Sequence, residues 1–145
     1  MEVDSFKYVS RLIARYYKLS SVKPEFPIPW TPLTRPLSDC RFGLVTSGGL
    51  YHAGHEPPFD LERERQEPAW GDPSFRTLPT GAPPSEIGVS HFHINAEDIL
   101  ADPNILLPVQ RFQELAEASR IRDLAPHAYS FMGYQGMPAD LTGWR

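Results

Sequence analysis

Cysteine is almost absent from this sequence. Cys40 is the single cysteine among 145 residues, which excludes an internal disulfide or a CxxC site within them. So little cysteine is typical of a reducing compartment, and we expect a cytoplasmic protein. The opening residues, Met-Glu-Val-Asp-Ser-Phe-Lys, are acidic and contain no apolar segment, so we expect no signal peptide.

Two further absences exclude broad classes of partner. The sequence has no run of about 18 apolar residues, the length that a membrane-spanning helix needs. An excess of positive charge is also missing, since the formal net charge is −4. Sequence-independent binding of nucleic acid requires a concentrated positive surface. We therefore expect neither a membrane nor a nucleic acid as a partner.

Proline, in contrast, is abundant. The chain contains 16 prolines, well above the average usage of about 5%. Proline lacks an N–H and interrupts regular elements, so much of the chain is expected to be extended or turning. The length corresponds to one domain, and the apolar content of 41% is sufficient for a core.

The N-terminal part is expected to form a helix followed by an extended strap. Residues 4–19 carry apolar side chains at helical spacing, including Phe6, Val9 and Ile13. Residues 23–36 are rich in proline, which favours an extended chain. Because this segment also contains Phe26 and Trp30, we expect it to lie across an apolar surface, its own or a partner's.

The remaining residues, 40–134, are expected to form an α/β body. Strand patterns occupy residues 41–46, 74–78, 87–94 and 128–132, and helical patterns follow Asn95 and cover residues 108–120. This alternation predicts an α/β fold with a small, mostly parallel sheet flanked by helices and long proline-rich loops. A sheet this small is poorly covered, which favours a second protein subunit as a partner.

Two histidines are separated by one residue on the strand predicted at 87–94. Residues i and i+2 of a strand point to the same face, so His91 and His93 would place their imidazoles side by side. Such a pair can hold two positions of a zinc, iron or copper site. Further candidate ligands are His127 as the third, and His52, His55 and Glu56 from the long loop. The alternatives are a polar site without metal at the same place and a purely structural role.

The strand predicted at 41–46 leads into a loop formed by Thr46, Ser47, Gly48 and Gly49. In open α/β sheets, ligands bind at the carboxyl ends of strands. Glycines let the backbone approach a small molecule and present N–H groups to an anion such as a carboxylate. We therefore expect these four residues to bind substrate, with a simple tight turn as the alternative. The loop matches no dinucleotide or P-loop motif, so no nucleotide is expected.

Other reactive side chains give weaker indications. Cys40 lies between an acidic and a basic residue, so its neighbours predict no activated thiolate. Ser47 is not surrounded by a nucleophile elbow. The charged run at residues 60–67, which includes Glu64, predicts a solvated surface or a short helix.

Several short motifs follow one another in the order of a known family. They are residues 36–49 (PLSDCRFGLVTSGG), 71–76 (GDPSFR), 88–94 (GVSHFHI), 102–112 (DPNILLPVQRF) and 127–133 (HAYSFMG). With these motifs, residues 29–134 resemble the N-terminal part of the selenoprotein B component of the glycine, sarcosine, betaine and D-proline reductases.

The resemblance implies a part in reductase chemistry. In that family the B component carries a selenocysteine or cysteine redox site, and partner subunits, some with a pyruvoyl group, bind or activate the amine substrate. Reductive cleavage of a C–N bond follows. The family's redox site comes after the stretch that corresponds to residues 131–133, and residues 134–145 contain neither selenocysteine nor cysteine. We therefore expect a second protein subunit to supply the redox thiol.

Three hypotheses of function follow. In the first, the chain is a subunit of a hetero-oligomeric reductase-like enzyme, and residues 46–49 with His91, His93 and His127 line a shared active site for a small-molecule substrate. In the second, it is a metal-binding enzyme or domain that uses His91 and His93. In the third, it is a non-catalytic scaffold subunit.

Overall fold

The computed structural model describes residues 10–20, 30–67 and 70–133. The chain divides into two compact units, Met1–Thr34 and Arg35–Arg145. In the first unit the structure describes one helix, α1 (Arg11–Ser20). It overlaps the helix predicted at residues 4–19 and ends one residue later. The first residues of that prediction, 4–9, lie outside the described residues. Of the predicted strap, residues 30–36 contain neither helix nor strand, and residues 23–29 lie outside the described residues.

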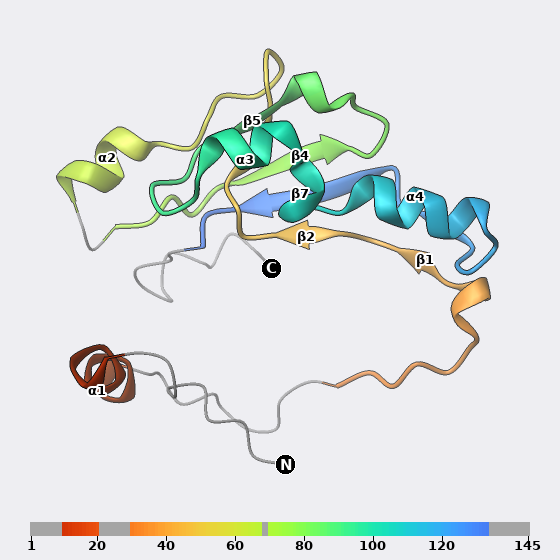
Figure 1. Ribbon diagram of the computed structural model, residues 1–145, viewed down its shortest axis with the longest axis horizontal. Helices are drawn as coiled ribbons and strands as arrows, with labels where there is room; N and C mark the ends of the chain where they lie inside the picture. The colour runs from red at the N-terminus through yellow and green to blue at the C-terminus, as the bar shows by residue number, and fades with distance from the viewer. Residues whose placement is uncertain (1–9, 21–29, 68–69, 134–145) are drawn as a thin grey trace. The chain divides into compact units, whose positions relative to one another are not determined.

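The second unit mixes short helices and short strands, as Figure 1 shows. Its α-helices are α2 (Leu61–Gln66), α3 (Ala96–Ala101) and α4 (Val109–Glu117). Its strands are β1 (Arg41–Phe42), β2 (Val45–Thr46), β3 (Leu50–His52), β4 (Phe75–Pro79), β5 (Ile87–Val89), β6 (Asp123–Leu124) and β7 (His127–Phe131). Three single 3-10 turns, η1 (Leu37–Asp39), η2 (Pro84–Glu86) and η3 (Pro103–Ile105), complete the list. Among the described residues, no helix has both the length and the apolar character that crossing a bilayer requires.

The central strand is β7, in a three-stranded sheet with the order β2-β7-β4. β2 runs parallel to β7, whereas β4 runs antiparallel to it from the Phe75–Phe131 pair to the Pro79–His127 pair. Two smaller ladders are the parallel β1–β6 pair and the antiparallel β3–β5 pair. The α/β class is confirmed, but a mostly parallel sheet is wrong, because the longest pairing is antiparallel. Alternating sequence patterns do not determine which strands pair, or in which direction.

β1 and β2 together correspond to the strand predicted at residues 41–46. The N–H of Ala125 donates to the carbonyl of Phe42 at 2.7 Å, and the N–H of Tyr129 donates to that of Leu44 at 2.9 Å. Between these bonds lies Pro126, which has no N–H to offer, so the parallel pairing is interrupted there. This explains why one run of sequence appears as two short strands.

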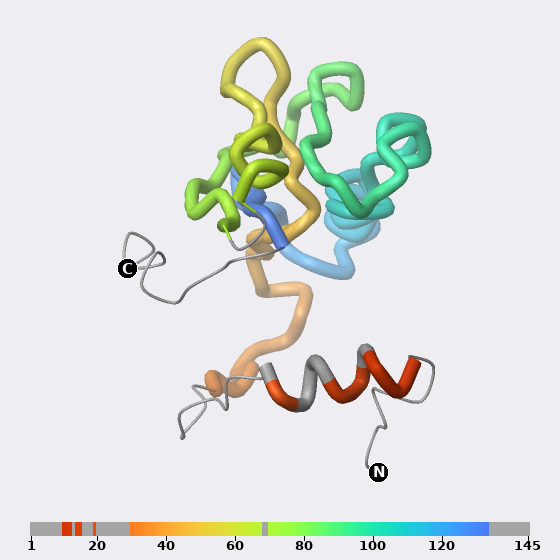
Figure 2. The backbone as a smooth tube through the Cα atoms, turned by 90° about the vertical axis from the view of Figure 1, so that its left-hand side faces the viewer, coloured from red at the N-terminus to blue at the C-terminus, as the bar shows by residue number. Residues whose placement is uncertain are grey.

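The core lies between the strands and the helices α3 and α4. Its buried members are Leu50, Leu78, Ile99, Leu107 and Ala128. Figure 2 shows α3 and α4 together on one side of the strands. Successive side chains of β7 point to opposite faces of the sheet. Tyr129, between the buried Ala128 and Ser130, therefore points to the other face and is exposed. These two helices therefore cover one face of the sheet rather than flanking both.

The strand predicted at 87–94 is shorter than expected. β5 ends at Val89, and the N–H of Ser90 makes one further bond, to the carbonyl of Gly49 at 2.8 Å. Gly49 has a φ of 66°, a conformation that turns the neighbouring chain away from the ladder. Beyond Ser90 the chain has no strand to pair with, and residues 92–93 form a turn.

The two predicted helices of the body are confirmed as α3 and α4. Asn95 caps α3, since its side chain accepts from the N–H of Glu97 at 3.2 Å and donates to the carboxylate of Asp98 at 2.8 Å. Pro108 precedes the first residue of α4, where a missing N–H costs nothing.

A buried ion pair attaches the loop before α2 to β4. Arg76 is 8% exposed and donates to the carbonyls of Pro57 at 2.8 Å and Pro58 at 3.1 Å. Asp72 is 7% exposed, lies 3.9 Å from the Arg76 guanidinium, and accepts from the N–H of Asp60 at 3.0 Å. The Ser74 hydroxyl bonds to both side chains. Two charges that would be costly to bury alone are thereby satisfied.

These contacts also determine the ionisation of Asp72. Burial acts to raise the pKa of Asp72, but hydrogen bonds from Ser74 and the N–H of Asp60 outweigh it, and the net pKa is lowered. The unfolded chain therefore binds a proton more readily than the folded protein. The stabilisation is complete above the ordinary aspartate pKa of about 3.9 and is lost as the pH falls through the lower folded value.

We predict that Asp72→Asn destabilises the fold by about 1–3 kcal/mol at pH 7, because one acceptor oxygen and the charge opposite Arg76 are lost. Urea denaturation at pH 7 and again below pH 4 measures this. The variant should lose less stability on acidification than the wild type does. Asp39→Asn, at an exposed carboxylate, is the control. Equal unfolding free energies for Asp72→Asn and wild type at pH 7 would contradict the prediction.

Candidate functional site

Three segments that are distant in sequence meet where β2 and β7 end. Gly48 forms a bridge with Met132, and the N–H of Gly49 donates to the carbonyl of Phe131 at 3.2 Å. A Cβ placed on Gly133 would lie 3.2 Å from the carbonyl oxygen of Ser47 and 3.6 Å from Nε2 of His91. We call this region the glycine–histidine corner; it comprises residues 46–49, 90–93 and 132–133.

Two of the three glycines of the corner, Gly48 and Gly49, are closely packed, and at Gly49 the neighbour is backbone. A Cβ on Gly48 would lie 2.6 Å from the Leu106 side chain, and one on Gly49 would lie 2.2 Å from the carbonyl oxygen of Ser90. The N–H of Gly48 donates to the hydroxyl of Thr46 at 3.1 Å, and that of Gly49 is used by Phe131. These two N–H groups are therefore engaged within the protein, which differs from the expected anion cradle. The exposed Ser47 remains available to a ligand.

His91 is the half-buried histidine of the corner. Its Nδ1 accepts from the N–H of His93 at 3.1 Å, so in the neutral ring the hydrogen is on Nε2, the atom that faces Gly133. Burial, with a smaller contribution from His93, lowers the pKa of His91. At neutral pH the imidazole is uncharged and holds its N–H donor close to Gly133 and Ser47.

His93 is exposed and lies in the turn after β5, so the expectation that both imidazoles project from one strand is wrong. The two rings are 5.9 Å apart and meet edge to face. Within residues 10–20, 30–67 and 70–133, the metal-ligand cluster that the structure contains is His52, His55 and Glu86, and it includes neither His91 nor His93.

The structure does not bring the other predicted histidines to the corner. His127 is the exposed first residue of β7 and pairs with Pro79, whereas the corner follows the last residue of that strand. From His127 to Gly133, extended chain spans roughly 20 Å. His52 and His55 lie at the far end of β3 from Gly49. Glu56 accepts from the N–H of Thr77 at 3.1 Å, which occupies its carboxylate.

Sequence reasoning did not identify Glu64 as part of this region. One carboxylate oxygen of Glu64 is buried and has no hydrogen-bond partner among the described residues. Burial raises the pKa of Glu64, although the charge of His93 acts to lower it. The guanidinium of Arg65 lies 5.3 Å from the centre of the Phe92 ring, so α2 packs beside the histidine turn. In the sequence, only the spacing of Leu61 and Glu64 on one face of α2 indicates burial.

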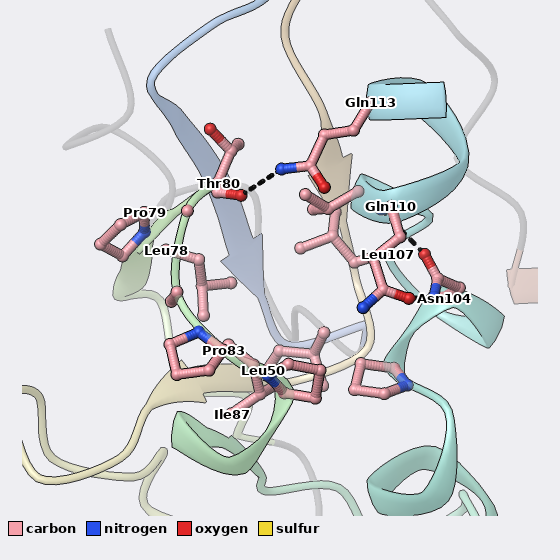
Figure 3. A pocket seen from close by; sticks show the side chains of 15 residues that line it. Leu50, Leu78, Pro79, Thr80, Pro83, Ile87, Asn104, Leu107, Gln110 and Gln113 are labelled. Atoms are coloured by element: carbon pink, nitrogen blue, oxygen red, sulfur yellow. Dashed lines mark hydrogen bonds between the residues drawn. The ribbon is translucent and has the colours of Figure 1, made fainter. Parts of the chain in front are cut away.

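A separate pocket of about 240 Å³ lies on the core side of the β3–β5 ladder (Figure 3). Leu50, Leu78 and Leu107 form apolar walls. At its rim, Gln113 donates to the carbonyl of Thr80 at 2.9 Å. None of its lining side chains is ionisable, so the pocket suits an uncharged group rather than a charged amino acid.

Comparison with known proteins gives one informative similarity. Over 114 residues, which are 78% of this chain, the sequence is 35% identical to D-proline reductase subunit gamma from Acetoanaerobium sticklandii. The matched region is 43% of that protein, so the chain spans less than half the length of this relative. No family model and no solved structure matches the chain. The similarity confirms the kinship that the motifs predict: the chain is related to the proline and glycine reductase family.

Proposed function

We propose that the chain is a subunit of a hetero-oligomeric reductase complex, and that its glycine–histidine corner contributes part of an active site whose redox thiol or selenol comes from a partner subunit. The observation that carries this is the similarity to a D-proline reductase subunit. The substrate proposed is a small amine or amino acid. We place the complex in the cytoplasm, because thiols remain reduced there.

Reductive cleavage of a C–N bond requires two electrons and two protons. The C–N bond breaks, the carbon takes one proton to form a C–H bond, the nitrogen takes the second proton, and two thiol groups become a disulfide. His91 suits the proton-transfer part of this reaction, because its Nε2 carries the hydrogen and lies beside Gly133 and Ser47. Ser47 would position the substrate beside it.

Cys40 does not suit the thiol part. Its S–H donates to the carbonyl of Pro36 at 3.3 Å, ahead of β1, whereas the corner follows β2. The extended chain from Cys40 to Ser47 spans roughly 20 Å, too far for direct reaction with a substrate at the corner. Since Cys40 is the only cysteine of these 145 residues, the thiol comes from elsewhere.

The sheet offers a surface to such a partner. Val45, Phe75, Tyr129 and Phe131 line an apolar hollow on the face opposite α3 and α4, which we call the aromatic face. The side chains of Val45 and Tyr129 are 63% and 45% exposed. Contiguous apolar exposure of this kind marks interaction sites. Phe131 directly precedes residues 132–133 of the corner, so a subunit bound here would stand next to the proposed active site.

We predict that Val45→Glu prevents assembly. The tagged full chain, purified from its native host, should retain a stoichiometric cysteine- or selenocysteine-containing subunit, and the variant should lose it because a carboxylate is placed in the apolar contact. Leu100→Glu is the matched control, since Leu100 is 52% exposed on α3. Size-exclusion chromatography with mass spectrometry measures the association. A wild-type chain that is monomeric and without partners would contradict the proposal.

We predict that His91→Ala leaves the complex assembled but lowers kcat/KM by about 100-fold or more, as expected for loss of a proton-transfer group. The assay follows ring opening of D-proline to a linear primary amine, and amine release from glycine, sarcosine and betaine, with a dithiol as the electron donor. His127→Ala is the control for the position of the site. It should leave kcat/KM unchanged, because the structure does not bring that imidazole to the corner. An assembled His91→Ala complex with unchanged rate would favour a scaffold role instead.

A further inference from the structure

We propose that His52, His55 and Glu86 form a binding site for a divalent transition metal ion such as Zn²⁺, at the end of the β3–β5 ladder remote from the corner. The proposal does not depend on the reductase function. The donor atoms of the three side chains all lie within 4.8 Å of one another. The set of two imidazoles and one carboxylate is one that zinc and its neighbours prefer.

The backbone holds the three residues together. His52 is the last residue of β3 and pairs with Ile87, the residue after Glu86. The N–H of Ala53 donates to the carbonyl of Glu86 at 2.8 Å, which continues the ladder by one bond. His52 at the end of β3 and Glu86, which ends η2 just before β5, are therefore fixed as neighbours, and the Nε2 atom of His52 lies 2.9 Å from the Glu86 carboxylate.

A tight turn then returns His55 to the same place. Gly54 has a φ of 80°, in the left-handed region that glycine adopts without strain. The N–H groups of His55 and Glu56 both donate to the carbonyl of His52, at 3.1 and 2.9 Å. As a result the rings of His52 and His55 stack with their centres 4.1 Å apart. Glu56 accepts from Thr77 and secures the turn to β4, so it supports the site rather than binding the ion.

The side chains combine one fixed donor with two adjustable ones. The side chain of His52 is 13% exposed and that of Glu86 is 45% exposed, while His55 is exposed. Around a tetrahedral zinc ion, with bonds of about 2.0–2.2 Å, donors stand about 3.4 Å apart. The donor atoms, now 2.9 Å to at most 4.8 Å apart, are close to that spacing, and the exposed His55 and Glu86 side chains can move to reach it. Three protein ligands leave one coordination position open, as in catalytic rather than structural zinc sites.

Residues close to Glu86 in the chain line the uncharged pocket. Pro84 and Ile87, close to Glu86 on either side in the chain, both line that pocket, and Ile87 is seen there in Figure 3. Leu50 lines it too, and His52 is on the same face of β3 as Leu50, because residues i and i+2 share a face. The three ligands themselves do not line this cavity, so an ion would be close to its walls in the chain without being part of them.

Isothermal titration of the chelator-treated full chain with Zn²⁺ tests the proposal. We expect one equivalent to bind, with Kd raised about 100-fold or more in His55→Ala and in Glu86→Gln. Both changes are at partly or fully exposed side chains, and circular dichroism verifies that each variant is folded. Zn²⁺ should raise the Tm of the wild type and leave that of His55→Ala unchanged, because only the folded wild type offers the site.

Two controls separate this site from the other histidines. His127→Ala and the double variant His91→Ala/His93→Ala should bind Zn²⁺ as the wild type does. Mg²⁺ should not compete, since it prefers an all-oxygen shell. The absence of saturable Zn²⁺ binding, full binding in His55→Ala and Glu86→Gln, or binding lost in the His91/His93 variant would each overturn the proposal. None of these results bears on assembly or on reductase activity.

Discussion

The hydrogen bond from the N–H of Leu50 to the hydroxyl of Ser130, 2.8 Å long, joins β3 to the three-stranded sheet, and both residues are completely buried. An unmade bond in such a place would cost the desolvation of both groups, so the chain is held at this crossing. Next to it, Gly49 is bound to Phe131 on one side and to Ser90 on the other. The corner therefore forms because these hydrogen bonds hold the start of β3 against the end of β7. The side chains that line it are positioned by buried backbone contacts rather than by the exposed loop itself.

Local sequence pattern predicted the elements well where local forces decide them. The helix at residues 108–120 and the cap at Asn95 follow from apolar spacing and side-chain bonding within a few residues. The strand at 87–94 was overestimated because its end depends on Gly49, a residue distant in sequence that removes the pairing partner. The prediction of a mostly parallel sheet was wrong for the same reason, because the antiparallel pairing of β4 with β7 joins residues far apart in the chain.

The site residues show a similar division. The motifs brought residues 46–49 and His91 to attention, and the structure places them together. The spacing of His91 and His93 was interpreted as a strand face, whereas the turn gives each imidazole its own surroundings. Glu64 escaped notice because it lies in a charged run, which normally remains solvated. Its burial depends on α2 packing beside Phe92, a contact that no local pattern contains.

The five histidines of the chain thus fall into groups with different physical settings. His91 is half-buried and neutral, with its N–H directed at a polar corner, whereas His52 and His55 stack beside a carboxylate. The β3–β5 ladder lies between the two groups, and from Gly49 to His52 it spans only about 10 Å. The turn at Gly54 is connected to the corner by this short ladder, one end of which is held by the Leu50–Ser130 bond, and also by β4, to which Glu56 attaches the turn. Because the two groups have different neighbours and no side chain in common, the corner and the His52 cluster are treated as separate sites, with separate chemistry and independent tests.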